Sequence, residues 1–287
     1  MTNLWTPSPE FTDIWAEISA IMPHAPHLVE SVAARIAFYD SSVWNSMNLV
    51  DNLSRRDSYL IRFTLPLAEL HGWPTREDST LTDALAAHFF WALCWRHLDN
   101  VFDANSIDQE DVGNLAAVIC RATRVHVTVG RIVQREWSDE IISLIQTLSE
   151  TAMRERISPV PRNLIWQRAT PFLIVPKTLL GLSRDQLSIY KSYINLSGLG
   201  HDVHDLMNDV RLGIASLPAS WFSELDPQLS FRRDVVNAWF DKAIIELLAA
   251  ESDLSMKIVG HEYKILSFFL SEAEQLRESL GSHSLPR

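Results

Sequence analysis

Apolar residues recur with the period of an α-helix along almost the whole chain. Prolines and glycines divide this pattern into segments, because proline ends a helix and glycine accepts the backbone angles of a turn. No segment has the alternation of apolar and polar residues that is typical of a strand. The pattern predicts helices over residues 10–22, 27–44, 54–70, 81–102, 108–135, 138–156, 163–180, 183–211, 231–252 and 261–280.

Two of the predicted helices have distinctive interiors. The 81–102 segment is apolar on nearly every side, which predicts a central, buried helix. The 163–180 segment contains Pro171 and Pro176, which predict a kink because proline lacks the N–H that a helix needs. No long linker separates the helices. The sequence therefore predicts an all-α fold in which residues 1–287 form a single-domain bundle of about ten helices.

Glycine is scarce in this chain, and large aromatic residues are abundant. The 287 residues include nine glycines, ten tryptophans and twelve phenylalanines. Nine glycines are less than half of the roughly 7% that is usual in proteins. Nucleotide-binding α/β folds use glycine in their phosphate-binding turns, so this class of fold is disfavoured. The composition agrees with long helices around a substantial apolar interior.

The formal net charge is −11, which disfavours a nucleic-acid-binding protein because such proteins neutralise phosphates with basic residues. No apolar run reaches the roughly 18 residues of a membrane-spanning helix. The first residues also lack a basic start followed by an apolar stretch, so we expect a cytoplasmic protein with no membrane span. Cys94 and Cys120 have no CxxC spacing, and we expect two buried free thiols.

A first acidic motif lies at the end of the 81–102 helix. Asp99 and Asp103 are four residues apart and share one helix face, with Asn100 beside them. Trp95 and Trp91 stand one and two turns earlier on the same stripe. Two like charges at this spacing repel each other, so the motif favours a bound counter-ion. The alternative is a solvated helix end above two packed core rings.

A second acidic motif lies near the end of the predicted 183–211 helix. His201, Asp205 and Asp209 are four residues apart in turn and line one face, and Asp202 flanks that face. Carboxylate oxygens are the ligands that Mg²⁺ prefers, and substrate phosphates commonly complete its shell. His201 and His204 also permit a zinc site, but no third His or Cys stands nearby at a ligand spacing. The two motifs together indicate a diphosphate held by Mg²⁺ above an aromatic pit.

This order of features resembles the trans-prenyl diphosphate synthase family, within the class I isoprenoid synthase fold. The most similar segment is 190–218, which reads YKSYINLSGLGHDVHDLMNDVRLGIASLP. Residues 99–103 stand where the family has its first DDxxD motif. Residues 201–205 stand at the second, with His201 in place of the first acid. The resemblance implies a helical bundle around a central active-site cavity and a homodimer.

The resemblance also implies ligands and their residues. The metal ligands would be Asp99, Asn100, Asp103, His201, Asp202, Asp205 and Asp209, which would bind about three Mg²⁺ ions together with the substrate. Arg168, Lys177 and Arg211 would bind the diphosphate of an allylic prenyl diphosphate. Asp99, Asp103, Asp202 and Asp205 would carry the catalytic role, and Trp91 and Trp95 would line the substrate pocket.

The chain departs from the family at the site for isopentenyl diphosphate. The basic segment before the first motif is replaced by residues 55–62, RRDSYLIR, which fits poorly. The residues after the motif, 104–110, contain no Arg or Lys, although a second diphosphate needs fixed cations. These departures favour a terpene synthase, which cyclises one allylic substrate. The alternatives are a prenyltransferase that uses isopentenyl diphosphate or another acceptor, and an inactive partner subunit of such a synthase.

Overall fold

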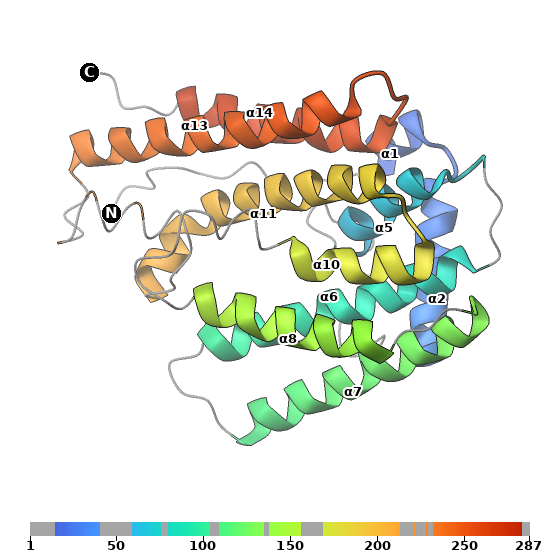
Figure 1. Ribbon diagram of the computed structural model, residues 1–287. Helices are drawn as coiled ribbons and strands as arrows, with labels where there is room; N and C mark the ends of the chain where they lie inside the picture. Colours follow the sequence, from blue (N-terminus) through green and yellow to red (C-terminus); the bar gives the residue numbers. More distant parts are fainter. Residues whose placement is uncertain are drawn as a thin grey trace.

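The computed structural model describes residues 15–40, 59–75, 80–103, 109–134, 138–155, 169–212 and 232–282, together with Trp221, Leu225 and Gln228. Within these residues the chain forms helices and no strand (Figure 1). The helices are α1 (Trp15–Ile21), α2 (Ala25–Tyr39), α5 (Tyr59–His71), α6 (Leu81–Asp103), α7 (Gln109–Ile132), α8 (Ser138–Glu155), α10 (Thr170–Val175), α11 (Arg184–Leu212), α13 (Arg233–Ile258) and α14 (Lys264–Ser282), with a π-helical turn, η1 (Pro176–Leu180), after α10.

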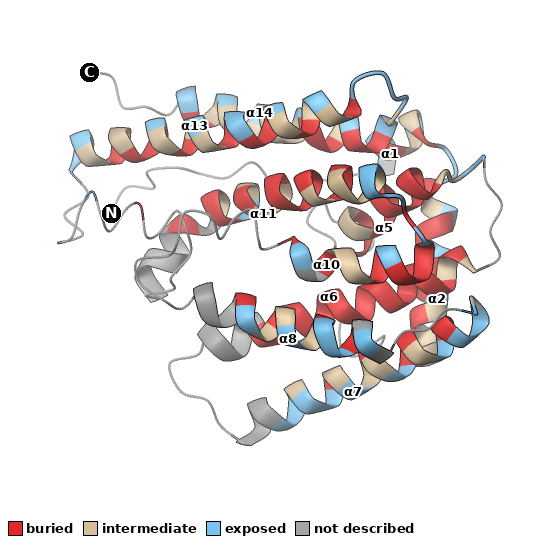
Figure 2. Ribbon diagram, viewed as in Figure 1, coloured by how far each residue is buried: buried red, intermediate tan, exposed pale blue. Residues whose placement is uncertain are grey.

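Helix α6 is the centre of the bundle, as its continuous apolar sequence predicts. Every side chain from Asp83 to Trp95 is buried, and Figure 2 shows the buried run along this helix. The helices that pack against α6 are α2, α5, α7, α8 and α10. On the other side of the molecule, α11 packs against α13 and α14, and α14 also contacts α5 and α1.

Several predicted boundaries differ from the observed ones. Helix α2 begins at Ala25, before the predicted start, because Pro26 is tolerated in a first turn, where its missing N–H costs nothing. It ends at Tyr39, since Asp40 is extended (φ −157°, ψ 98°), so the predicted continuation toward residue 44 is wrong at this point. Helix α13 continues to Ile258, beyond the predicted end at 252, because Leu254 and Ile258 extend its buried face.

The predicted kink at Pro176 takes a specific form. At Pro176 the α10 helix changes into the π-helical turn η1, which widens the helix where proline cannot donate. The hydroxyl of Thr178 donates to the carbonyl of Ile174 (2.8 Å), and Gly181 closes the turn in the left-handed conformation (φ 65°). This turn lets the chain reverse directly into α11.

The N-terminus of α14 is capped by a residue from another helix. Glu69 of α5 is 7% exposed, and its two carboxylate oxygens accept hydrogen bonds from the backbone N–H groups of Ile265 (2.9 Å) and Leu266 (3.0 Å). These N–H groups lack partners within the helix, and a carboxylate at this end also interacts favourably with the helix dipole. Glu69 therefore joins segments that are almost 200 residues apart in the chain.

The two cysteines are both free, as expected, but only one of them is buried. Cys94 lies inside α6 and is 0% exposed. Cys120 is exposed on α7, so the expectation of two buried thiols is wrong for this residue. The reason is that α7 has a solvent-facing side, on which Cys120 lies. None of the described helices is long and apolar enough to cross a membrane.

Two buried histidines are expected to make the protein sensitive to acid. His88 and His126 are 2% and 0% exposed, and burial lowers the pKa of each to about 4, from an ordinary value near 6.5. As the pH falls from about 6.5 to 4, these two histidines therefore bind protons in the unfolded chain but stay neutral in the folded chain. Stability should be fully present above pH 6.5 and fall through this window by about 1.4 kcal/mol per pH unit for each histidine.

The variant His126→Gln tests this expectation, because glutamine keeps an acceptor for the indole N–H of Trp91, which donates to His126 Nδ1 (3.1 Å). The free energy of unfolding, measured by urea titration between pH 4.5 and 7, should depend less steeply on pH in the variant. His27→Gln is the matched control, since His27 is 81% exposed. If the free energy of unfolding of His126→Gln depended on pH as steeply as that of the wild type, buried His126 would not be a source of the acid sensitivity.

Candidate active site

A buried hydrogen bond joins α6 to α11 and sets their register. The hydroxyl of Tyr190 lies 3.3 Å from His88 Nε2, and both side chains are buried. The imidazole also hydrogen-bonds to the backbone of Phe172 in α10. Since that bond uses the N–H of the ring, the Nε2 atom accepts the hydrogen bond from the hydroxyl of Tyr190. Three helices that are distant in sequence are therefore fixed together at this point.

The two helices that carry the acidic motifs end on the same side of the molecule in Figure 1. Figure 1 shows α6 and α11 running in the same direction and ending at the left of the molecule. Position 99 follows His88 by 11 residues, and position 201 follows Tyr190 by 11. Eleven residues advance a helix by about 16 Å and return to within about 20° of the starting face. In an ideal helix, positions 99 and 201 would therefore stand on nearly the same faces as His88 and Tyr190.

The structure describes only part of the predicted ligand set. His201 is exposed, Asp202 is buried at 5% exposure, and His204 is half-buried. Residues whose backbone is helical but whose side chains lie outside the described part are Asp99, Asn100, Asp103, Asp205, Asp209 and Arg211. Among the side chains that are described, no three His, Cys, Asp or Glu residues form a group that could hold a metal. The predicted set itself stays a prediction.

Among the three predicted diphosphate-binding residues, only Lys177 has a side chain that the structure describes. Lys177 is exposed on η1, and its hydrocarbon chain therefore leaves the core. Arg168 lies outside the described residues. The described segment resumes one residue later with Ala169, which leads directly into α10. Lys177 lies in η1, two residues after the end of α10.

The two predicted pocket residues, Trp91 and Trp95, are both buried but have different neighbours. The indole N–H of Trp91 donates to His126 of α7, so this ring belongs to the α6–α7 interface. The ring of Trp95 instead meets Phe172 of α10 edge-on, with centroids 5.9 Å apart. Although Trp91 and Trp95 lie on one stripe of α6, Trp91 therefore contacts α7, and Trp95 contacts α10.

Trp95 is one member of an aromatic cluster that the sequence pattern does not reveal. We define this cluster as Phe63, His88, Trp95, Phe172 and Tyr190. Phe63 and Phe172 stack with centroids 5.2 Å apart, and Phe63 lies 5.5 Å from His88. His88 in turn meets Tyr190 edge-on at 5.9 Å. The members come from α5, α6, α10 and α11, so no local spacing could have grouped them.

The cluster lies before the ends of α6 and α11 that carry the acidic motifs. Trp95 precedes position 99 by one helical turn. Phe63 is half-buried, and Leu173 and Ile174 of α10 are half-buried beside Phe172. On α6 the cluster therefore reaches to one turn before the first acidic motif, whereas its α11 member, Tyr190, stands eleven residues before the second. An apolar chain with an anionic head suits such an arrangement when divalent cations neutralise the acids.

A basic residue near the cluster is already paired. Arg62 of α5 forms an ion pair with Glu272 of α14 (3.2 Å), and its guanidinium lies 5.2 Å from the ring centroid of Phe269. The backbone carbonyl of Arg62 also accepts the hydroxyl of Tyr193 (2.9 Å). Arg62 is the last basic residue of the 55–62 segment, so the charge of this position is directed toward α14.

Comparisons with known proteins identify the fold. No family model matches the chain, and no curated protein matches it. The chain is similar to the crystal structure of a geranylgeranyl pyrophosphate synthase from Corynebacterium glutamicum, with a TM-score of 0.53 and 16% sequence identity. The match covers 96% of this chain and 95% of the other. At this identity the likeness establishes the fold alone, and it confirms the expected all-helical isoprenoid synthase fold.

Proposed function

We propose that this chain is a Mg²⁺-dependent terpene synthase that ionises an allylic prenyl diphosphate and cyclises the resulting carbocation. The observation that carries the proposal is the His88–Tyr190 bond, which joins the two helices whose sequences contain the acidic motifs. The shared fold with a geranylgeranyl pyrophosphate synthase supports it. We propose further that residues 1–287 act as one domain, in line with the packing of α1 against α14.

The donor set fits a hard divalent cation. Five carboxylates and one amide supply oxygen, and His201, which is exposed on α11, supplies one nitrogen. We assign Asp99, Asn100, Asp103, His201, Asp202, Asp205 and Asp209 to the metals. Mg²⁺, when bound, would neutralise the negative charge of the leaving diphosphate. Arg168, Lys177 and Arg211 are proposed to bind diphosphate oxygens from the protein side.

The reaction is a heterolysis followed by ring closure. The allylic C–O bond breaks, both electrons leave with the diphosphate oxygen, and the prenyl chain becomes a carbocation. The rings of Trp95 and Phe63 can stabilise this cation through their faces, by up to about 2 kcal/mol each in a dry site. A double bond of the same chain then attacks the cation, and loss of a proton or capture of water ends the reaction.

The paired state of Arg62 favours cyclisation over chain elongation. A second diphosphate needs cations that are directed at it, whereas Arg62 is bonded to Glu272. The second candidate is a prenyltransferase, which is favoured by the activity named for the similar structure, a geranylgeranyl pyrophosphate synthase. A third, an inactive partner subunit, is motivated by Asn100 and His201, which stand where the family has acids.

A single assay separates the three candidates. The purified chain is incubated with Mg²⁺ and geranyl, farnesyl or geranylgeranyl diphosphate, with and without isopentenyl diphosphate, and products are read by gas chromatography and mass spectrometry. A hydrocarbon or alcohol formed from one allylic substrate alone supports the cyclase. Product that appears only with isopentenyl diphosphate or another acceptor supports the prenyltransferase. No turnover under any condition supports the inactive subunit.

Trp95→Leu is expected to change the product ratio more than it changes the affinity for Mg²⁺. The reason is that Trp95 contributes a ring to the aromatic cluster, while leucine keeps apolar volume but removes the π face. Product ratios are measured by gas chromatography, and Mg²⁺ affinity by the dependence of rate on metal concentration. Trp91→Phe is the control, because Trp91 belongs to the α6–α7 interface. An unchanged product spectrum in Trp95→Leu would place this ring outside the substrate pocket.

A further inference from the structure

The side of α11 that carries Tyr190 becomes more accessible toward the second acidic motif. In an ideal helix, Ile194, Ser197, Gly198 and His201 all stand within about 80° of the direction of Tyr190, which contacts α6. Along this side Tyr190 is 0% exposed and Ile194 is 7% exposed, whereas Ser197 and Gly198 are half-buried and His201 is exposed. The packing on this side of α11 therefore begins to open at Ser197 and Gly198.

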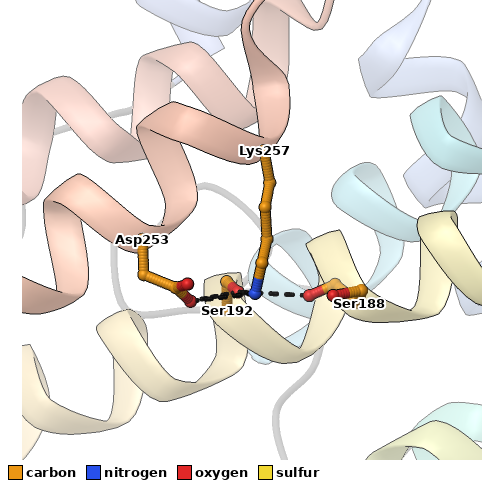
Figure 3. A network of polar contacts seen from close by, with 4 residues as sticks. All are labelled: Ser188, Ser192, Asp253 and Lys257. Carbon is orange, nitrogen blue, oxygen red and sulfur yellow. Dashed lines mark hydrogen bonds and ion pairs between the residues drawn. The ribbon is translucent and has the colours of Figure 1, made fainter.

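Another side of α11 is closed by α13. The hydroxyl of Ser192 donates to Asp253 Oδ2 (2.5 Å), and its oxygen accepts a hydrogen bond from the ammonium group of Lys257 (2.6 Å). Figure 3 shows these three residues between the two helices, with Ser188 one turn earlier on α11. In an ideal helix Ser197 stands about 140° around the axis from Ser192. The serines at 188 and 192 thus lie at a helix interface, while Ser197 lies on the side that opens.

The hydroxyl group of Ser197 has a defined direction. Tyr193 donates its hydroxyl hydrogen to the backbone carbonyl of Arg62 (2.9 Å). Ser197 also hydrogen-bonds to the phenolic oxygen of Tyr193. Since the single hydroxyl hydrogen of Tyr193 is used by Arg62, Ser197 is the donor in this second bond. The group that Ser197 presents to its surroundings is therefore an oxygen with lone pairs, which is a hydrogen-bond acceptor.

Gly198 provides room beside this acceptor. A glycine inside a helix weakens it, so such a position calls for a reason. A Cβ atom at Gly198 would meet no atom of the described residues within 4 Å, whereas one at Gly200 would lie 3.6 Å from Leu276 of α14. Packing therefore does not require a glycine at position 198. Because helical side chains lean toward the N-terminus, the open space lies over the turn that contains Ser197.

An acceptor beside open space suits a small molecule with an O–H group. The oxygens of a diphosphate are themselves acceptors, and a prenyl chain has no polar hydrogen, whereas water has two. We propose that Ser197 and Gly198 form a water site, and that the water held there captures the last carbocation of the cyclisation, so that the product is a cyclic alcohol. This inference rests on the proposed function and selects one of its two endings.

The step balances without a further reactant. A lone pair of the water oxygen forms the new C–O bond at the cationic carbon, which gives a protonated alcohol. The extra proton passes to an oxygen of the diphosphate that was released in the first step. Ser197 accepts one O–H of the water, so a water lone pair is directed away from Ser197 and toward the cation. Ser197 acts through the water and is thus a positioning residue.

Ser197→Ala is expected to lower the ratio of alcohol to hydrocarbon by about tenfold, because the water loses its acceptor while the pocket stays open. Ser197→Thr keeps the hydroxyl and should keep the ratio. Ser188→Ala, the same change on the α13 side of the same helix, is the matched control (Figure 3). Products are read by gas chromatography and mass spectrometry in ¹⁸O-labelled water, and the wild-type alcohol should carry the label. The ratio is measured on whatever turnover remains, so a partly destabilised variant still gives a result.

Gly198→Leu tests the space itself. The leucine side chain should displace the water and lower the same ratio, whereas Gly113→Leu, at an exposed position of α7 where a Cβ also meets nothing within 4 Å, should not. An unchanged ratio in Ser197→Ala, with or without a higher Mg²⁺ requirement, would overturn the water site. A wild-type product without alcohol would also overturn it and leave the cyclase intact. If the wild type turned over no allylic diphosphate, the proposed function would fall and this inference with it.

Discussion

Asp99→Ala and Asp205→Ala are each expected to reduce Mg²⁺-dependent turnover by at least about 1000-fold. Ionisation of a prenyl diphosphate depends on neutralising the leaving group, to which a metal contributes several kcal/mol, and each 1.4 kcal/mol of barrier is tenfold in rate. Removing one carboxylate from either helix removes a ligand that the other helix cannot supply. The measurement is kcat with the allylic substrate identified by the product assay.

The same variants are expected to keep their fold. Asp99 and Asp103 carry like charges one turn apart, so losing one of them relieves repulsion of a few tenths of a kcal/mol. Thermal unfolding of Asp99→Ala should therefore occur at or slightly above the wild-type temperature. Asp241→Ala, which removes an exposed acid from α13, is the activity control. Full activity in Asp99→Ala would show that the metal site has been assigned to the wrong residues.

Glu69→Ala should lower the free energy of unfolding by about 3 kcal/mol. The substitution leaves the backbone N–H groups of Ile265 and Leu266 buried without their acceptors, and each such group costs about 1–3 kcal/mol. It also removes the charge that stabilises the start of α14. For a chain of this size we expect Tm to fall by about 6–12 °C, as measured by circular dichroism.

Two further variants separate the capping role of Glu69 from the loss of a charge. Glu69→Gln keeps one acceptor oxygen, so it should be intermediate between the wild type and Glu69→Ala. Glu278→Ala removes an exposed acid from the same helix, α14, and should change Tm by no more than about 2 °C. If Tm fell by the same amount in Glu69→Gln and Glu278→Ala, Glu69 would not act as the cap of α14.

Much of the helical architecture is visible in the sequence because amphipathic periodicity is a local property. The central position of α6 follows from its apolar run, and the break at Pro176 follows from the missing N–H of proline. The exact ends are less predictable. Asp40 becomes extended and α13 continues past 252 for reasons of packing, which single-chain periodicity does not contain.

The candidate site divides in the same way. The spacing within 99–103 and within 201–209 predicts which residues share a helix face, since that depends only on the helical repeat. The pairing of His88 with Tyr190 has no such signal, because the two residues are 102 positions apart. The stacking of Phe63 on Phe172 is equally invisible, and Trp91 and Trp95 appear equivalent until α7 and α10 take their places.

The sequence by itself thus determined the all-helical fold, most of the helices and the two motifs in which the proposed metal ligands lie. These properties depend on contacts between residues a few positions apart. The tertiary structure alone decided that His88 of α6 meets Tyr190 of α11, that Glu69 caps a helix almost 200 residues away, and that Trp91 and Trp95 contact different helices. Such relations depend on side chains that meet only after the helices have packed, so no local pattern encodes them.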